Sequence, residues 1–404
     1  MSVNEPTQVT PEEQGENPVA DERLFARFGN FILKLPHGSL SSDEVHAALM
    51  EALRADSRVK ALANNTPEHS WTENDRWYPA WSNAEWDQLV SGSDSFYSKR
   101  FFSPIAFEVF VPLKNQPKIH GENPMVDTYD VAWDGCTAVV TWHRGDAEED
   151  APPAVGQVVV DILREVCKNA GYALYVQACS VACEHLFVHK EIRVNRWDAK
   201  DYSEQFHPEG SREIDLNVYG RYGRLQLVLL VHNLLASPSA DFARLKNIAR
   251  RTLDLDYGSQ ITMHELIAHD YETLRRSQEG ILKRLGFLIT GSWGAIKGNG
   301  RRKRANFLIA SLWLAMSNLE ALQRLFREAE RRYNDSVRHS ADPELFIGDL
   351  KSDEARVGEI NPFFARAAVE HKATRLDNTI VVWATAGGAI TGAAITAAAG
   401  GLLN

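Results

Sequence analysis

The stretch TYDVAWDGCTAVVTW, Thr128–Trp142, decides the fold of the first half of the chain. Two apolar runs flank the pair Asp134-Gly135, and an Asp-Gly pair supplies the positive φ of a two-residue β-turn. We therefore predict a β-hairpin here. Upstream, an alternation of apolar and polar side chains is typical of a strand with one buried face. The apolar members of that alternation are Ile105, Phe107, Val109, Val111 and Leu113.

Two amphipathic helices accompany these strands. Ser41 and Glu44 have the spacing of a capping box, which predicts a helix over about 41–63. A second helix is predicted over about 155–170, ended by Gly171. Further strands are predicted near 172–178, 185–194 and 213–219.

Runs of strands separated by a few helices predict an α+β domain over residues 23–222, with helices packed on one side of the sheet. From Gly223 onward helical periodicity replaces the strand patterns, so residues 223–377 form the second predicted domain. The apolar run 225–235 predicts a buried helix, followed by a connection at Ser237-Pro238-Ser239.

Two long helices then carry apolar residues at heptad spacing, with the glycine-rich segment 291–300 between them. This pattern predicts an antiparallel coiled-coil hairpin whose helices both end at that segment. A last helix is predicted over 353–375, with an interruption at Asn361-Pro362. The heptad residues are Ile267, Leu274, Ile281 and Leu288 in the first helix, and Leu308, Leu312, Ala315, Leu319, Leu322, Phe326, Ala329 and Tyr333 in the second.

The stretch NTIVVWATAGGAITGAAITAAAGGLLN, 378–404, contains no charged residue. As a helix, its apolar part, 379–403, would be ~37 Å long, which is enough to cross a hydrocarbon core of ~30 Å. Small residues at every fourth position let helix backbones approach each other in lipid. We predict a self-associating transmembrane helix; the alternative is a buried Gly/Ala-rich helix of a soluble core. The small residues are Ala384, Gly388, Gly392, Thr396 and Gly400.

The charges give the expected orientation and exclude some functions. Lys372 and Arg375 precede the apolar tail and no charged residue follows it, so the globular part is expected to face the cytoplasm. Residues 1–22 hold six acidic residues and no Lys or Arg, which predicts a disordered acidic tail. The net charge of −10 argues against a globally basic nucleic-acid binder. Four cysteines are too few for a disulfide scaffold and are expected to be reduced.

Five positive charges fall within eight residues at the predicted hairpin tip. They are Lys297, Arg301, Arg302, Lys303 and Arg304. Because the neighbouring stretch LGFLITGSWGAI is apolar and aromatic, we expect this cluster to bind an anionic membrane surface. A nucleic-acid backbone is the less favoured partner, and a solvated loop without a partner is the remaining alternative.

Three patterns of reactive side chains point only weakly to chemistry. Cys179, Cys183, His185 and His189 have zinc-ligand side chains, but strand residues four apart are separated by ~13 Å, so only a tight turn could unite them. In HELIAH, 264–269, the second histidine follows the first by five residues, whereas the zinc-protease motif needs four. The segment from Arg332 to His339 matches the loose Arg-x6-His pattern of helical ribonucleases. We therefore predict no metal and no cofactor, and assign no catalytic residue.

Together these features predict a tail-anchored, membrane-associated protein whose soluble part lies in the cytoplasm. Its α+β domain would bind an unidentified ligand or protein partner and would be coupled through the coiled coil to a homo-oligomerising segment in membrane lipid. This layout resembles that of membrane-disrupting effectors of bacterial immunity, and it leans away from an enzyme. The alternative is an enzyme, a hydrolase or nuclease, with its site in the α+β domain.

Overall fold

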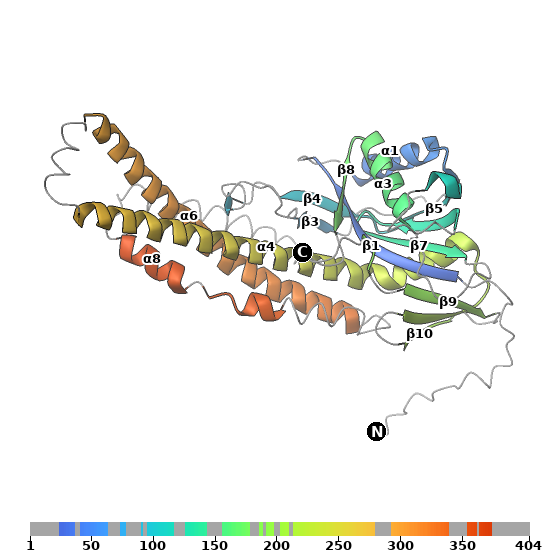
Figure 1. The fold of residues 1–404 in the computed structure, drawn as a ribbon. Coiled ribbons are helices and arrows are strands. Elements are labelled where there is room, and N and C mark those ends of the chain that lie inside the picture. Colours follow the sequence, from blue (N-terminus) through green and yellow to red (C-terminus); the bar gives the residue numbers. More distant parts are fainter. Residues whose placement is uncertain are drawn as a thin grey trace, which may run out of the picture. The chain divides into compact units, whose positions relative to one another are not determined.

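A computed structural model describes residues 24–36, 41–63, 73–77, 90–91, 95–116, 126–143, 156–177, 186–188, 191–197, 203–209, 213–278, 292–338, 354–361 and 363–373. Within these ranges a mixed β-sheet is combined with helices, which confirms the α+β class (Figure 1). The chain divides into two compact units. Unit 1 comprises Met1–Asn74, Ser98–Ala240 and Asp335–Leu345, and unit 2 comprises Asp75–Tyr97, Asp241–Asn334 and Phe346–Asn404.

A nine-stranded sheet in the order β10-β11-β9-β1-β7-β6-β5-β2 forms the centre of unit 1, and β8 pairs with β1. All of its pairings are antiparallel except that of β11 with β9. A separate two-stranded sheet pairs β3 (Glu73–Trp77) with β4 (Phe96–Arg100). The large sheet consists of β1 (Leu24–Lys34), β2 (Val59–Leu62), β5 (Ile105–Phe110), β6 (Thr128–Trp133), β7 (Thr137–His143), β8 (Ala173–Gln177), β9 (Glu191–Trp197), β10 (Ser203–Glu209) and β11 (Glu213–Tyr219).

Helices α1 (Ser42–Ala55) and α3 (Gln157–Asn169) cover one face of this sheet. Their apolar side chains share a buried core with alternate residues of the strands, such as Phe31 and Val140. The predicted capping box is confirmed, because the Glu44 backbone N–H donates to Ser41 Oγ at 3.2 Å and the Ser41 N–H donates to Glu44 Oε2 at 3.1 Å.

Three predicted boundaries in unit 1 are wrong. Helix α1 ends at Ala55, not near residue 63, because the Asp56 carboxylate accepts the Arg58 N–H at 2.9 Å and the chain then forms β2 against β5. Strand β9 begins at Glu191, six residues after the predicted start. Leu113 is exposed in a short 3-10 helix, Leu113–Asn115, and not on the buried face of β5. The sequence pattern also did not predict strands β1, β2, β3, β4 and β10.

Helix α4 (Arg224–Gln278) contributes its first 17 residues to unit 1 and the rest to unit 2. It contains Pro238, so the predicted connection at 237–239 is wrong. A helix that continues through a proline lacks one backbone hydrogen bond, because proline has no N–H donor. Immediately after the proline, Ser239 is fully buried, and its Oγ donates to Asn30 Oδ1 of β1 at 3.0 Å. Because Asn30 lies on the sheet face away from α1 and α3, the prediction of helices on one side only is also wrong.

Unit 2 is built around α4 and α6 (Ser292–Arg338), with α8 (Phe363–Ala373) beside them. Every predicted heptad residue of α6 is buried. In α4 the prediction is off by one position, because Ile267 is exposed and Leu266 is buried in its place. The side chain of Leu274 and residues 281 and 288 lie outside the described part of the chain.

Two contacts at different positions along the helix axes show that α4 and α6 run antiparallel. Near one end the rings of Phe242 and Tyr333 lie 5.6 Å apart, and near the other Arg304 Nη2 lies 3.3 Å from Glu265 Oε2. The rest of the coiled-coil hairpin stays a prediction. The expected break over 291–300 is wrong for nearly all of that segment, since α6 already begins at Ser292. Glycine costs only about 1 kcal/mol per helical position, so propensity alone does not fix where a helix starts.

A short helical segment precedes α8. The predicted interruption at Asn361-Pro362 is confirmed: residues 354–358 are helical, and α8 starts at Phe363, whose N–H donates to Asn361 Oδ1 at 3.0 Å. By length and composition alone, Lys303–Val337 is the one described helix that could cross a membrane, although half of its most apolar window is buried, as in a core helix. The tail 378–404 and residues 1–22 lie outside the described residues.

Candidate functional site

The sheet face opposite α1 and α3 carries a buried row of polar side chains. On β1, β6 and β7, Asn30, Asp130, Thr137 and Thr141 occupy the positions that alternate with residues of the α1/α3 core. All four are almost completely inaccessible to solvent. Because buried polar groups need hydrogen-bond partners, this row requires a polar partner from the element that covers it.

The turn between β6 and β7 lies at the centre of this row, and its residues are buried. Trp133 pairs with Ala138, which makes Gly135 and Cys136 the two central residues of the turn. The predicted hairpin is therefore confirmed, but the turn lies one residue further along than an Asp-Gly-centred turn. Gly135 has a φ of 88°, and a Cβ at this position would lie 2.7 Å from the carbonyl oxygen of Lys99, so only glycine fits.

Asp134 closes the turn with its side chain and is 1% exposed. Its Oδ1 accepts the backbone N–H groups of Cys136 at 2.9 Å and Thr137 at 2.7 Å, while its Oδ2 lies 2.6 Å from Arg100 Nε. The turn also bonds to the neighbouring strand, because the Phe31 N–H donates to the Cys136 carbonyl at 2.8 Å. A carboxylate therefore holds together segments that are far apart in the sequence.

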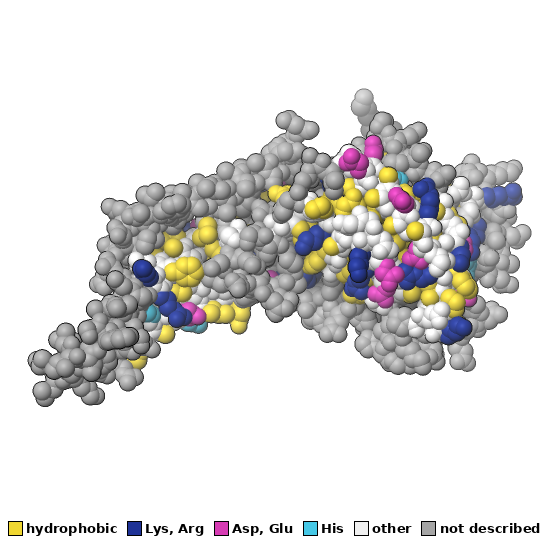
Figure 2. Space-filling view, turned by 90° about the horizontal axis from the view of Figure 1, so that it is seen from above, with side chains coloured by type: hydrophobic (Ala, Val, Ile, Leu, Met, Phe, Trp, Pro, Cys, Tyr) yellow, Lys and Arg dark blue, Asp and Glu magenta, His cyan; other side chains and the backbone are white. Residues whose placement is uncertain are grey.

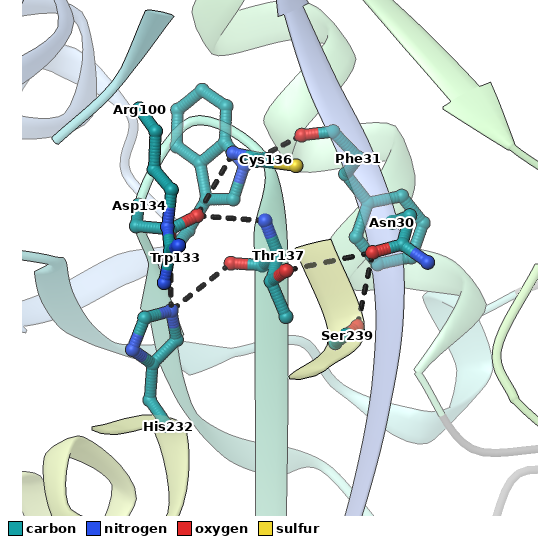
Figure 3. A network of polar contacts seen from close by, with 9 residues as sticks. All are labelled: Asn30, Phe31, Arg100, Trp133, Asp134, Cys136, Thr137, His232 and Ser239. Atoms are coloured by element: carbon teal, nitrogen blue, oxygen red, sulfur yellow. Dashed lines mark hydrogen bonds and ion pairs between the residues drawn. The ribbon is translucent and has the colours of Figure 1, made fainter. Parts of the chain in front are cut away.

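His232 of α4 covers the same turn and is 2% exposed (Figure 3). Its Nε2 lies 3.2 Å from the Thr137 carbonyl oxygen and 3.7 Å from Asp134 Oδ2. Since a carbonyl only accepts, Nε2 carries the proton. Burial lowers the pKa of His232, and the nearby Asp134 carboxylate opposes that shift only in part.

Two further contacts extend the row at either end. Arg224 Nε donates to Asp130 Oδ2 at 3.1 Å, and Arg224 Nη1 lies 3.5 Å from Glu108 Oε2. Asp130 is 1% exposed, and among the described residues its Oδ1 has no hydrogen-bond partner, so burial raises the pKa of this carboxyl group. At the other end, Asn30 Oδ1 accepts from Ser239 and, at 3.4 Å, from Thr137 Oγ1.

We call these contacts of Arg224, His232 and Ser239 with the sheet the α4 polar ladder. The three residues are eight and seven positions apart, which places them on one face of the helix after about two turns each. Each meets a buried polar group of a different part of the row, so the ladder sets which turn of α4 lies over which strand. A shift of α4 by one turn would separate the buried Asp130 carboxylate from Arg224, and the buried His232 and Ser239 side chains from their partners, at a cost of several kcal/mol.

The ladder is suited to holding a helix and not to chemistry on a substrate. Asp134 and His232 lie 3.7 Å apart, as catalytic groups can, but Asp130 lies four residues from Asp134 along the chain, and all three are buried and contact structural partners. Among the residues that the structure describes, no three His, Cys, Asp or Glu side chains come close enough to hold a metal ion.

The site residues predicted from sequence lie elsewhere. Lys303 and Arg304 are exposed on α6, whereas the side chains of Lys297, Arg301 and Arg302 lie outside the description. HELIAH is helical within α4, and Arg332 Nη2 lies 3.2 Å from Glu328 Oε1. The small residues of the tail, the Cys179/Cys183/His185/His189 group and His339 fall outside the described residues.

Sequence reasoning missed the ladder. The signals were the polar interruptions in otherwise apolar runs, namely Asp130 in TYDVAW and His232 in LQLVLLVHNLL. Such an interruption shows that a polar group is buried, but it does not show which partner it meets. Comparisons with protein-family models, curated proteins and solved structures found no match.

His232 gives the α+β unit a pH dependence that can be tested. Its ordinary pKa is 6.5, and the folded value is lower, so below pH 6.5 the unfolded chain binds more protons than the folded chain. The free energy of unfolding should therefore fall as the pH drops below 6.5, by at most about 1.4 kcal/mol per pH unit from this residue.

Replacing His232 with Gln keeps a donor for Thr137 and removes this titration. Urea midpoints measured from pH 7 to pH 5 should fall less steeply for His232→Gln than for the wild type. Asp130, whose folded pKa is raised, contributes with the opposite sign, but it is present in both proteins and cancels in the comparison. Equal slopes would show that His232 does not titrate differently on unfolding.

Proposed function

We propose that this protein is a membrane-anchored sensor or effector whose α+β unit controls a helical unit through α4. In this proposal the α+β unit binds a ligand or protein partner, and residues 379–403 anchor the chain in a membrane and associate with other copies. The observation that carries the proposal is that α4 belongs to both units: the polar ladder holds its first part on the sheet, and its remainder packs with α6.

This arrangement supports coupling because α4 would carry a change in the buried polar contacts of unit 1 into unit 2. A partner that changes the strands beneath α4 would act on buried polar pairs, and such pairs have few intermediate arrangements. The α6 heptad, with every member buried, supports a coiled coil as the element that carries the change. The general layout is that of a membrane-disrupting effector of bacterial immunity.

The alternative is a hydrolase or nuclease with its site in the α+β unit. Among the described residues of this unit, Asp130, Asp134 and His232 are buried, so these three are not placed to meet a substrate.

Cell fractionation tests the proposed anchor. We expect the full chain to sediment with membranes and to resist alkaline carbonate extraction, whereas a chain ending at Asp377 should not. Gly392→Arg should oppose insertion by roughly 3 kcal/mol, because it places a charge in the hydrocarbon core. A full chain that stays soluble, or that carbonate releases, would contradict the anchor.

Gly392→Leu separates anchoring from assembly. Leucine adds hydrophobicity but blocks close backbone contact at the small-residue stripe. Membrane insertion should therefore persist while chemical cross-linking between copies decreases, and Ala398→Leu, off the stripe, provides the matched control. Unchanged cross-linking in Gly392→Leu would leave the segment as an anchor only.

A further inference from the structure

We propose that unit 2 has a second membrane contact, an aromatic collar that docks on an anionic phospholipid surface. The collar consists of Ile267 and Tyr271 of α4, Lys303, Arg304 and Phe307 of α6, and Phe363 of α8. This inference rests on the proposed membrane association and names the lipid chemistry that a region other than the apolar tail would recognise.

Three helices bring the collar residues to one height. Leu266 of α4, Leu308 of α6 and Ala365 of α8 belong to one buried cluster. Each apolar collar residue lies within five positions of one of these three, and the Glu265–Arg304 contact lies at the same level. The collar residues therefore lie at one level of the packed helices.

The apolar side chains of the collar are unusually exposed for their size. Tyr271 is 68% exposed and Phe363 is 63% exposed, and Ile267 and Phe307 are about half exposed. Large apolar side chains that gather at one level of a protein surface are typical of interaction sites. Figure 2 shows hydrophobic side chains of the described residues exposed next to Lys and Arg side chains.

The local charge identifies the partner. In the sequence, residues 261–304 contain nine Lys and Arg and four Asp and Glu, a net charge of +5, although the whole chain carries −10; of these cations, the structure describes the side chains of Lys303 and Arg304. Lys303 and Arg304 project from this segment beside Phe307, and both are exposed. The Glu265–Arg304 ion pair is itself exposed, so it is screened and leaves Arg304 able to meet another anion.

Cations beside aromatic side chains suit the headgroup region of an anionic bilayer. There the charged groups meet lipid phosphates while tyrosine and phenylalanine enter the boundary of the acyl chains. Nucleic acid fits less well, because Ile267 offers no ring for base stacking and the aromatic residues belong to three different helices.

Vesicle binding by the full chain tests this inference. The background is Gly392→Arg, which removes tail insertion as a route to the bilayer. The probe is a vesicle of equal parts phosphatidylserine and phosphatidylcholine, compared with phosphatidylcholine alone. We expect binding only with phosphatidylserine, and a loss of roughly 100-fold in the triple variant Tyr271→Ser/Phe307→Ser/Phe363→Ser.

Tyr257→Ser is the matched control, because Tyr257 is 59% exposed on the same helix but lies 14 residues before Tyr271 and outside the collar. Its vesicle binding should equal that of the background. Replacing Arg301, Arg302, Lys303 and Arg304 with Gln should weaken binding most at low salt. Circular dichroism of each variant excludes misfolding as the cause.

Three results would overturn the inference. The first is triple-variant binding equal to that of the background, and the second is equal binding of the background to both kinds of vesicle. The third is tight binding of single-stranded RNA that the four Gln substitutions abolish while vesicle binding persists, which would assign the cations to nucleic acid. Since the tail is disabled throughout, failure here leaves the carbonate result on the anchor unaffected.

Discussion

Asp134→Ala should lower the free energy of unfolding of the α+β unit by about 3–5 kcal/mol. The substitution removes the acceptor of two buried backbone N–H groups, those of Cys136 and Thr137. It also removes the 2.6 Å partner of Arg100 and the carboxylate near His232. The loss should appear as a lower midpoint of urea unfolding, measured by tryptophan fluorescence.

Asp161→Ala is the matched control for Asp134→Ala. Asp161 also pairs with an arginine, Arg164, at 2.9 Å, but both side chains are nearly half exposed on α3. An exposed pair contributes about 1 kcal/mol or less, so this variant should unfold close to the wild type. Asp134→Asn keeps one acceptor oxygen, so its free energy of unfolding should lie between those of Asp134→Ala and Asp161→Ala. If Asp134→Ala lost less stability than Asp161→Ala, the Asp134 carboxylate would not hold the turn between β6 and β7.

Leu319→Asp should destabilise unit 2 by about 4 kcal/mol or more. Leu319 is 2% exposed in the heptad row of α6, so aspartate would place a charge without a partner among apolar side chains. The helical signal at 222 nm should melt at a lower temperature. The purified variant should also aggregate more than the wild type, because the heptad row of α6 becomes accessible to other chains.

Ser317→Asp provides the control two residues earlier on the same helix, where the side chain is exposed. It introduces the same charge and should shift the melting temperature very little. Leu319→Met keeps the volume and should cost less than about 1.5 kcal/mol. Equal melting of Leu319→Asp and Ser317→Asp would contradict the assignment of the heptad row to the core.

Local chemistry explains the parts of the fold that the sequence predicted. Ser41 and Glu44 cap α1 through groups only three residues apart, and Asp134-Gly135 marks a turn that glycine alone can form. The heptad row of α6 repeats over seven turns, so its buried face follows from periodicity. In each case the signal lies in residues that are close in the sequence: the spacing of Ser41 and Glu44, the positive φ of Gly135 and the repeat of the heptad row.

Tertiary structure decided where the elements end and what the buried polar groups meet. Asp130 and His232 were visible as polar residues in apolar runs, but their partners, Arg224 and the Thr137 carbonyl, lie 94 and 95 residues away. Helix α4 runs through Pro238 because contacts such as that of Ser239 with Asn30, 209 residues away, outweigh the local preference for a break. Helix propensity depends on the residue itself, and the free-energy cost of an unfavourable residue such as proline is a few kcal/mol at most. Separating a buried polar pair costs several kcal/mol. The sequence by itself determined the α+β class, the capped helix, the hairpin and the heptad row; only the folded chain placed α4 over the sheet and assembled the ladder beneath it.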